Sequence, residues 1–100
     1  MKIMSKFDEY KNSINLVLSN IDEVQLDKSI KIIKKTVKKN GKIYIVGNGG
    51  SSSIASHVSV DFSKVAKIQS STFNNSNLIT CFANDYGYEN WVTEAIKAYM

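Results

Sequence analysis

The stretch GKIYIVGNGGSSSIASHVSVDF, residues 41–62, decides the fold of this sequence. Lys42 to Val46 consists largely of β-branched and aromatic residues, which predicts a short strand buried on both faces, as parallel strands usually are. A turn of glycines and one asparagine, residues 47–50, breaks the strand. After three serines, apolar residues recur at helical spacing to about residue 64. A strand, a glycine turn and a helix in this order indicate an α/β layered fold.

The glycine turn is the first candidate binding site. It leaves backbone N–H groups unpaired at a helix N-terminus, where the helix dipole also favours an anion. Asn48 and the three serines add hydrogen-bonding side chains, so the turn is suited to the hydroxyls or phosphate of a small polar ligand at the strand's carboxyl end. A P-loop needs a lysine after its last glycine, and a dinucleotide-binding turn needs glycine where Ser52 stands. NTP hydrolysis and NAD binding are therefore disfavoured, while a tight loop with an N-cap serine remains the purely structural alternative.

His57 and Asp61 form the second candidate. They are four residues apart, so a helix places them on the same side, one turn from each other. An imidazole and a carboxylate in this arrangement can share a Zn²⁺ ion, divide acid and base roles, or form a surface hydrogen-bonded pair. The spacing alone leaves these alternatives open.

The rest of the chain adds helices and one further strand. Helical spacing predicts helices over residues 5–20, 27–39 and 89–98, with Asn40–Gly41 as a left-handed stop after the second. Residues 67–73 predict a second strand, and the local pattern of residues 78–83 favours a strand as well. Residues 42–46 are the one firm strand and residues 67–73 the second candidate, and a parallel sheet of two strands cannot cover these helices. The domain therefore either finds strands in a partner or belongs to a longer chain.

Composition narrows the class of protein. An apolar fraction of 43% and a charged fraction of 22% are typical of one ordinary globular domain. Lysine carries all the positive charge, and seven lysines lie within residues 28–42. Five of them lie opposite the apolar stripe of the predicted helix, as on a solvated face: Lys31, Lys34, Lys35, Lys38 and Lys39. Without arginine, nucleic acid is not an expected partner, and no apolar run is long enough for a membrane span. Lack of a signal-like N-terminus and of a cysteine pair favours the cytoplasm, with Cys81 as a small buried hydrophobe.

Two motifs carry a resemblance to a known family. GNGGSSSIASHVSVDF, residues 47–62, resembles the signature of the phosphosugar-binding SIS fold, and within it of the phosphoheptose (sedoheptulose 7-phosphate) isomerases. NLITCFANDYGYENWVTEAIKAY, residues 77–99, is similar to the same family's T-A-x-x-N-D-Y-G-Y-E segment. The resemblance runs from about Phe7 to the end of the chain. It implies a three-layer α/β fold with a parallel sheet flanked by helices, a strand near residues 68–72 and a short helix through residues 78–83.

The resemblance also implies roles for particular residues. The positions that match the family's substrate contacts are Asn48, Gly49, Gly50, Ser51, Asn84 and Asp85. His57 matches a metal-binding histidine, with zinc as the metal, and Asp61 falls where the family usually has a glutamate that is metal ligand and acid–base catalyst. The implied activity is aldose–ketose isomerisation of a sugar phosphate through an enediol, in the synthesis of heptose precursors of lipopolysaccharide or capsule. Homotetramers with active sites at subunit interfaces are implied too, and the aromatic residues after residue 85 suit such a contact or plain internal packing.

The sequence departs from the family in two ways. Aspartate at position 61 is shorter than glutamate by one methylene group, which changes its reach by about 1.5 Å, and a misplacement of about 1 Å can cost a hundredfold in rate. The family's Ser/Thr-rich phosphate loop and its later glutamine and histidine lie in a C-terminal half that nothing here matches. We therefore expect residues 1–100 to be the N-terminal part of one SIS domain, with a helical lead-in over 5–40, a strand–turn–helix over 42–66 and a second unit over 67–100. A non-catalytic phosphosugar-binding module and an inactive fragment of the isomerase are the alternatives.

Overall fold

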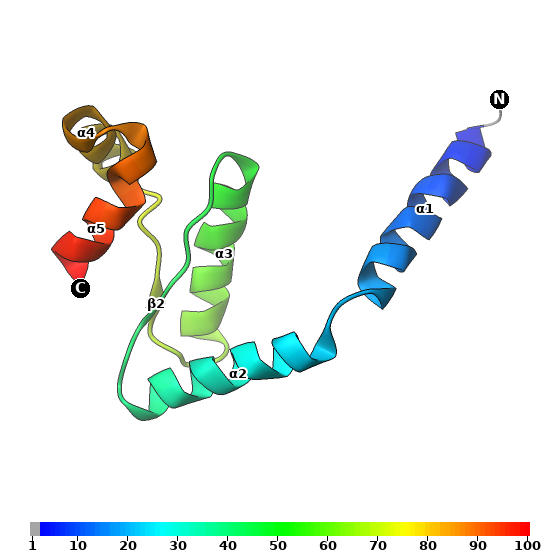
Figure 1. Ribbon diagram of the computed structural model, residues 1–100, viewed down its shortest axis with the longest axis horizontal. Helices are drawn as coiled ribbons and strands as arrows, with labels where there is room; N and C mark the ends of the chain where they lie inside the picture. The colour runs from blue at the N-terminus through cyan, green and yellow to red at the C-terminus, as the bar shows by residue number, and fades with distance from the viewer. Residues whose placement is uncertain (1–2) are drawn as a thin grey trace. The chain divides into compact units, whose positions relative to one another are not determined.

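The computed structural model describes residues 3–100, with side chains from residue 5 onward. The chain forms two compact units, Met1–Ile33 and Lys34–Met100. Figure 1 labels helices α1 to α5 and strand β2. The first unit consists of α1 (Ile3–Ser19) and the beginning of α2 (Glu23–Lys38), and all the other elements belong to the second.

Helix α2 starts four residues earlier than the sequence pattern predicted. The Oδ1 atom of Asp22 accepts hydrogen bonds from the backbone N–H groups of Val24 (2.9 Å) and Gln25 (3.2 Å). Asp22 is therefore the N-cap, and it satisfies two donors that the first helical turn would otherwise leave unpaired. The predicted end of this helix is confirmed, because Asn40 adopts a left-handed φ of 56° directly after α2.

The second unit contains the predicted strand–turn–helix. β1 (Ile43–Tyr44) and β2 (Ser70–Ser71) pair in parallel, with Ile43 opposite Ser70. The N–H of Ile43 donates to Gln69 O at 2.9 Å and that of Ile45 to Ser71 O at 3.0 Å. α3 (Gly50–Lys64) connects the two strands. Both strands are shorter than predicted but lie where the sequence placed them.

The C-terminal part of the second unit is helical. α4 (Ser76–Tyr86) is followed by a 3₁₀ turn, η1 (Tyr88–Asn90), and by α5 (Trp91–Tyr99). The strand that local propensity favoured for residues 78–83 is wrong, and the helix implied by the resemblance is confirmed. The Oδ1 atom of Asn75 caps the helix by accepting from the N–H groups of Asn77 (2.9 Å) and Leu78 (3.3 Å). The helical period also places apolar side chains of α4 against the core, namely Leu78, Ile79, Phe82 and Ala83.

A small core holds this unit together. Phe73, Trp91 and Ala95 are buried, and half-buried residues of β1, α4 and α5 pack against them. The ring of Tyr44 on β1 stacks on Phe73 at a centroid distance of 4.6 Å. Ala55 on α3 is buried as well. α3 lies on one side of the strands and α4 and α5 lie on the other (Figure 1). Both residues of β1 are only half-buried and Ser71 of β2 is exposed, so the predicted burial of the first strand on both faces is only partial.

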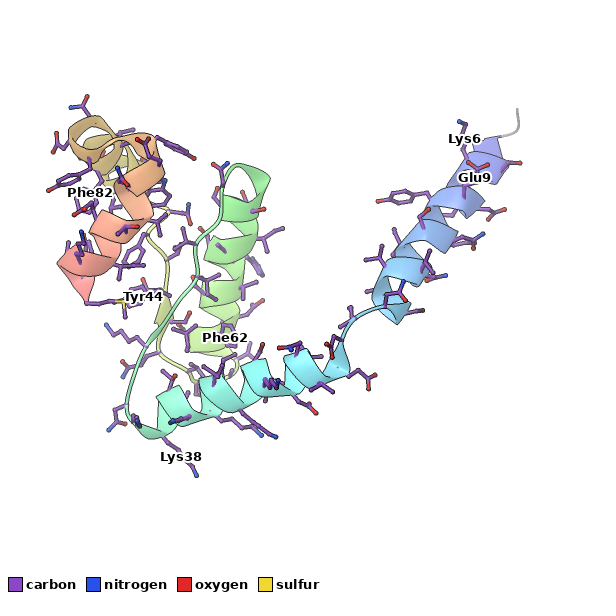
Figure 2. The ribbon with its side chains drawn as sticks, viewed as in Figure 1. Lys6, Glu9, Lys38, Tyr44, Phe62 and Phe82 are labelled. Atoms are coloured by element: carbon purple, nitrogen blue, oxygen red, sulfur yellow. The ribbon has the colours of Figure 1, made fainter. Side chains whose placement is uncertain are left out.

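Two predictions about individual side chains have different outcomes. The lysines of α2 are exposed as expected, and Lys38 projects away from the helix in Figure 2. Cys81, expected to be buried, is exposed. Because residues 78–83 form a helix, the face that carries Cys81 is turned away from the Trp91 core. It lines an open surface depression together with Tyr44, Phe82 and Tyr99.

Much apolar surface remains uncovered within residues 5–100. Large apolar side chains of α1 and α2 are exposed, among them Phe7, Tyr10, Val17, Val24 and Leu26. No side chain of α2 is fully buried. Over residues 3–100, no helix combines the length and the hydropathy that crossing a bilayer requires. The amphipathic stripes that predicted these helices therefore face solvent in this chain.

Candidate functional site

The glycine turn that joins β1 to α3 depends on two of its glycines. A Cβ atom on Gly47 would lie 2.1 Å from Ser51 O and 2.3 Å from Ser51 C, which no side chain tolerates. Gly49 has φ 58° and ψ −124°, a combination that is essentially restricted to glycine. Gly47 thus allows the backbone at the start of α3 to lie close to the end of β1. Gly49 reverses the direction of the chain so that it enters α3.

The turn presents free hydrogen-bond donors at the start of α3. Asn48 O accepts from Ser51 N at 3.0 Å, and Gly49 O accepts from the N–H and the hydroxyl of Ser52 at 3.0 and 2.6 Å. Within the described chain, the N–H groups of Gly49 and Gly50 have no hydrogen-bond partner. The N-cap is Gly49 and no side chain caps α3, so the simple alternative of a serine N-cap is wrong. Two exposed donors at a positive helix end suit an anionic or hydroxyl-bearing ligand.

His57 and Asp61 lie on α3 as their spacing predicted. His57 Nε2 is 3.5 Å from Asp61 Oδ2, and the two side chains are 79% and 58% exposed. Two atoms that bind one tetrahedral zinc at about 2.0–2.1 Å lie about 3.3 Å apart, so the pair fits two adjacent ligand positions. Residues 3–100 contain no group of three or more histidine, cysteine or acidic side chains placed around one metal position. The separation of the pair matches two ligand positions of a four-coordinate site, and in this structure the pair is a contact between an imidazole and a carboxylate on the surface of α3.

The second predicted substrate-contacting pair lies at the end of α4. Asn84 Nδ2 donates to Asp85 Oδ1 at 3.4 Å, and both side chains are exposed. In the part of the chain that the structure describes, no hydrogen bond joins this pair to the glycine turn. A hydrogen bond from the second motif reaches the turn from Tyr88, whose hydroxyl donates to Asn48 Oδ1 at 2.5 Å.

Asn74 is a residue of this region that sequence reasoning did not select. Its Nδ2 donates to Gly47 O at 2.7 Å and its Oδ1 accepts from Gly47 N at 3.1 Å. The hydroxyl of Thr72 also donates to that Oδ1 at 2.9 Å. Asn74 follows β2 as Gly47 follows β1. Because the carboxyl ends of neighbouring parallel strands meet at one edge of a sheet, the position of Asn74 just after the second predicted strand could have indicated that it lies beside the turn. Asn74 also lines an open surface depression together with His57, so it lies near one member of the candidate metal pair.

Comparison with known proteins identifies the family. A family model described as "SIS domain" matches residues 9–97, which is most of the chain. The chain belongs to the SIS domain family. Both motifs described above, the glycine turn with its helix and the segment around Asn84, fall inside the matched part of this SIS domain protein.

Several curated relatives of this SIS domain protein share one name. The phosphoheptose isomerase of Helicobacter pylori (strain P12) is 30% identical over 96% of this chain and 53% of its own length. That of Fusobacterium nucleatum is 30% identical over 96% and 54%, and phosphoheptose isomerase 2 of Campylobacter jejuni is 32% identical over 70% and 37%. No solved structure matches the chain significantly. The chain spans about half the length of the curated relatives it matches.

Proposed function

We propose that this chain is the N-terminal part of a sugar-phosphate isomerase of the phosphoheptose isomerase type, which interconverts a 2-ketose and an aldose phosphate. The observation that carries the proposal is the His57–Asp61 pair, held at 3.5 Å on the helix that starts at the glycine turn. The names of relatives at about 30% identity support the same activity. In this proposal the two compact units belong to one three-layer SIS domain, subdivided as the sequence suggests into a helical lead-in over 5–40, a strand–turn–helix over 42–66 and a second unit over 67–100.

In this proposal some of the described residues bind the substrate and another transfers a proton. The N–H groups of Gly49 and Gly50, with Asn48 and the hydroxyl of Ser51, bind oxygen atoms of the sugar phosphate at the positive end of α3. Asn84 and Asp85 provide a second contact. The carboxylate of Asp61 moves a proton between C1 and C2 of the substrate, through an enediol whose oxyanion is stabilised by hydrogen-bond donors.

His57 and Asp61 are also the residues that would hold a zinc ion. Their separation fits two ligand positions, and the remaining ligands come from outside the residues described, as the family resemblance implies. Bound zinc supplies Lewis-acid polarisation of the substrate oxygen. Asp61 is then either a metal ligand or the group that transfers the proton.

Asp61→Asn in the full-length protein tests the proposal. With sedoheptulose 7-phosphate as substrate we expect turnover to be abolished and the circular dichroism spectrum to stay unchanged, because Asp61 is exposed and has no packing role. Asp8→Asn is the matched control, since Asp8 is a comparably exposed helical aspartate in an ion pair with Lys11 at 3.2 Å. Full activity of the Asp61 variant would remove this residue from the mechanism.

A phosphosugar-binding module without catalysis is the second candidate. It is favoured by aspartate at position 61, whose shorter side chain differs from the glutamate of the family pattern. Chelation distinguishes the two functions. An isomerase that depends on zinc loses turnover in EDTA and regains it when zinc is added, whereas a binding module binds sugar phosphate equally well with and without the chelator.

We also propose self-association, with a homotetramer as the expected state. The uncovered apolar side chains of α1 and α2 support it, because soluble proteins rarely leave such contiguous surface exposed. The aromatic residues considered for this contact divide into two groups. Trp91 is buried inside the chain at 5% exposure, whereas Tyr86, Tyr88 and Tyr99 are at least half exposed and remain open to a partner.

A further inference from the structure

We propose that Tyr88 is a positioning residue that fixes the side-chain amide of Asn48, so that its NH₂ group faces the ligand. This rests on the proposed function of the glycine turn. It adds Tyr88 to the site and assigns Asn48 the role of hydrogen-bond donor, neither of which the sequence motifs indicate. The two residues are far apart along the chain, and their hydrogen bond joins the two motifs.

The hydrogen bond from Tyr88 occupies the oxygen atom of the Asn48 side-chain amide and leaves its NH₂ group free. The Tyr88 hydroxyl donates to Oδ1 of Asn48, so the oxygen of this amide already has a partner. A carboxamide has one acceptor oxygen and two N–H donors. In the described chain, Asn48 Nδ2 makes no hydrogen bond. Asn48 is therefore presented as a donor, alongside the free N–H groups of Gly49 and Gly50.

The position of Tyr88 is itself determined by the backbone. Gly87 ends α4 with a positive φ of 87°, and its N–H donates to Ala83 O at 2.9 Å. The chain then enters η1 and reaches Trp91, which is anchored in the core. Tyr88 is thus held between a helix end and a buried side chain. Asn48 and Tyr88 line one open depression together with Glu89 and Trp91, so the pair is reachable by a small ligand.

The ligand chemistry follows from this polarity. The free donors of the turn, the N–H groups of Gly49 and Gly50 and the NH₂ group of Asn48, match a group with several acceptor oxygens, such as the phosphate or the carbonyl and hydroxyl oxygens of a sugar phosphate. If the amide were free to rotate, half of its orientations would present Oδ1 to the same oxygens and repel them. The Tyr88 hydroxyl removes that possibility before the ligand arrives, which is a preorganisation effect.

The test compares Tyr88→Phe with Tyr86→Phe in the full-length protein. Tyr86 is similarly exposed and its ring packs edge-on against Phe82, but its hydroxyl makes no hydrogen bond within the described residues. In the ligand-free protein labelled with ¹⁵N-asparagine, we expect the side-chain NH₂ signals of Asn48 to shift in Tyr88→Phe and to stay in place in Tyr86→Phe. Those signals are assigned from their loss in Asn48→Ala.

Binding of sedoheptulose 7-phosphate, measured by titration calorimetry, gives the second readout. One neutral hydrogen bond corresponds to a loss of about 2- to 10-fold in affinity, which we expect for Tyr88→Phe and not for Tyr86→Phe. Asn48→Asp keeps the acceptor for Tyr88 but replaces the NH₂ by an oxygen, and we expect it to weaken binding by about tenfold or more.

The two proposals fail in different ways. Unchanged Asn48 signals in Tyr88→Phe, or equal affinity of the two tyrosine variants, would overturn the positioning role. If the wild-type protein binds no sugar phosphate at all, the proposed function is wrong, and the ligand-free spectra still decide whether Tyr88 orients Asn48.

Discussion

Substitution of Gly47 by alanine tests whether the close approach of α3 to the end of β1 is a real constraint. The added methyl group would meet backbone atoms only, Ser51 O at 2.1 Å, Ser51 C at 2.3 Å and Ser52 N at 2.8 Å. Ordinary contacts of this kind begin at 3.4 Å, so the start of α3 has to move away by more than 1 Å. Backbone cannot rotate out of the way as a flexible side chain does.

Two effects of the Gly47→Ala substitution lower the free energy of unfolding. Forcing an extra carbon into a packed position costs about 1–3 kcal/mol. The shift also strains both hydrogen bonds between Gly47 and Asn74, each worth about 0.5–1.5 kcal/mol. We therefore expect the free energy of unfolding to fall by roughly 2–6 kcal/mol, a large share of the 5–15 kcal/mol that is typical of a whole protein.

Urea unfolding followed by the fluorescence of Trp91 measures this loss. Trp91 is the single tryptophan of the sequence and is buried in the same compact unit. Gly47→Ala should lower the urea midpoint by about 1 M or more. Gly50→Ala is the control, because a Cβ there meets nothing within 4 Å and alanine favours the helix that begins at this residue. Equal midpoints for the two variants would refute the steric argument.

Three further predictions concern other parts of the chain. Asp22→Ala should destabilise the start of α2 by about 0.5–2 kcal/mol, seen as faster hydrogen exchange in its first turn, whereas Asp27→Ala, inside the same helix, should not. Cys81 should react with Ellman's reagent in the native protein, and a reaction that requires denaturant would show that it is covered. If the apolar stripe of α1 is a subunit contact, Ile14→Glu should lower the molar mass measured by light scattering, and the control Glu9→Gln should not. An unchanged mass for Ile14→Glu would exclude that contact.

The strand–turn–helix could be predicted from sequence because each of its signals is local. A β-branched run, a glycine cluster and a helical period follow one another within residues 41–62, and the structure places β1, the turn and α3 in that order. The same reasoning failed for residues 78–83, where apolar β-formers indicated a strand. The Asn75 cap and the packing of one face of α4 against the Trp91 core favour a helix there instead. The start of α2 was missed for a similar reason, although Asp22 with Gln25 three residues later is a capping pattern that the sequence does contain.

The candidate site could be predicted only in part, because several of its contacts join residues that are distant in the sequence. The spacing of His57 and Asp61 was sufficient to place them together, because a helix has a fixed period. No spacing rule connects Tyr88 to Asn48 or Asn74 to Gly47, since both contacts depend on how the segments fold against each other. Cys81 shows the same limit, because its exposure follows from the direction in which α4 packs.

The reciprocal bonding of Asn74 to Gly47 makes the loop sensitive to chemical ageing. An amide can donate to the Gly47 carbonyl and accept from the Gly47 N–H at the same time, whereas a carboxylate can only accept. Asparagine is a thermolabile residue, and hydrolysis of this one amide would set two acceptor oxygens against each other at the entrance of the glycine turn. Storage or heating would then alter the turn without any change in the gene, and a mass increase of about one unit at Asn74 would report it.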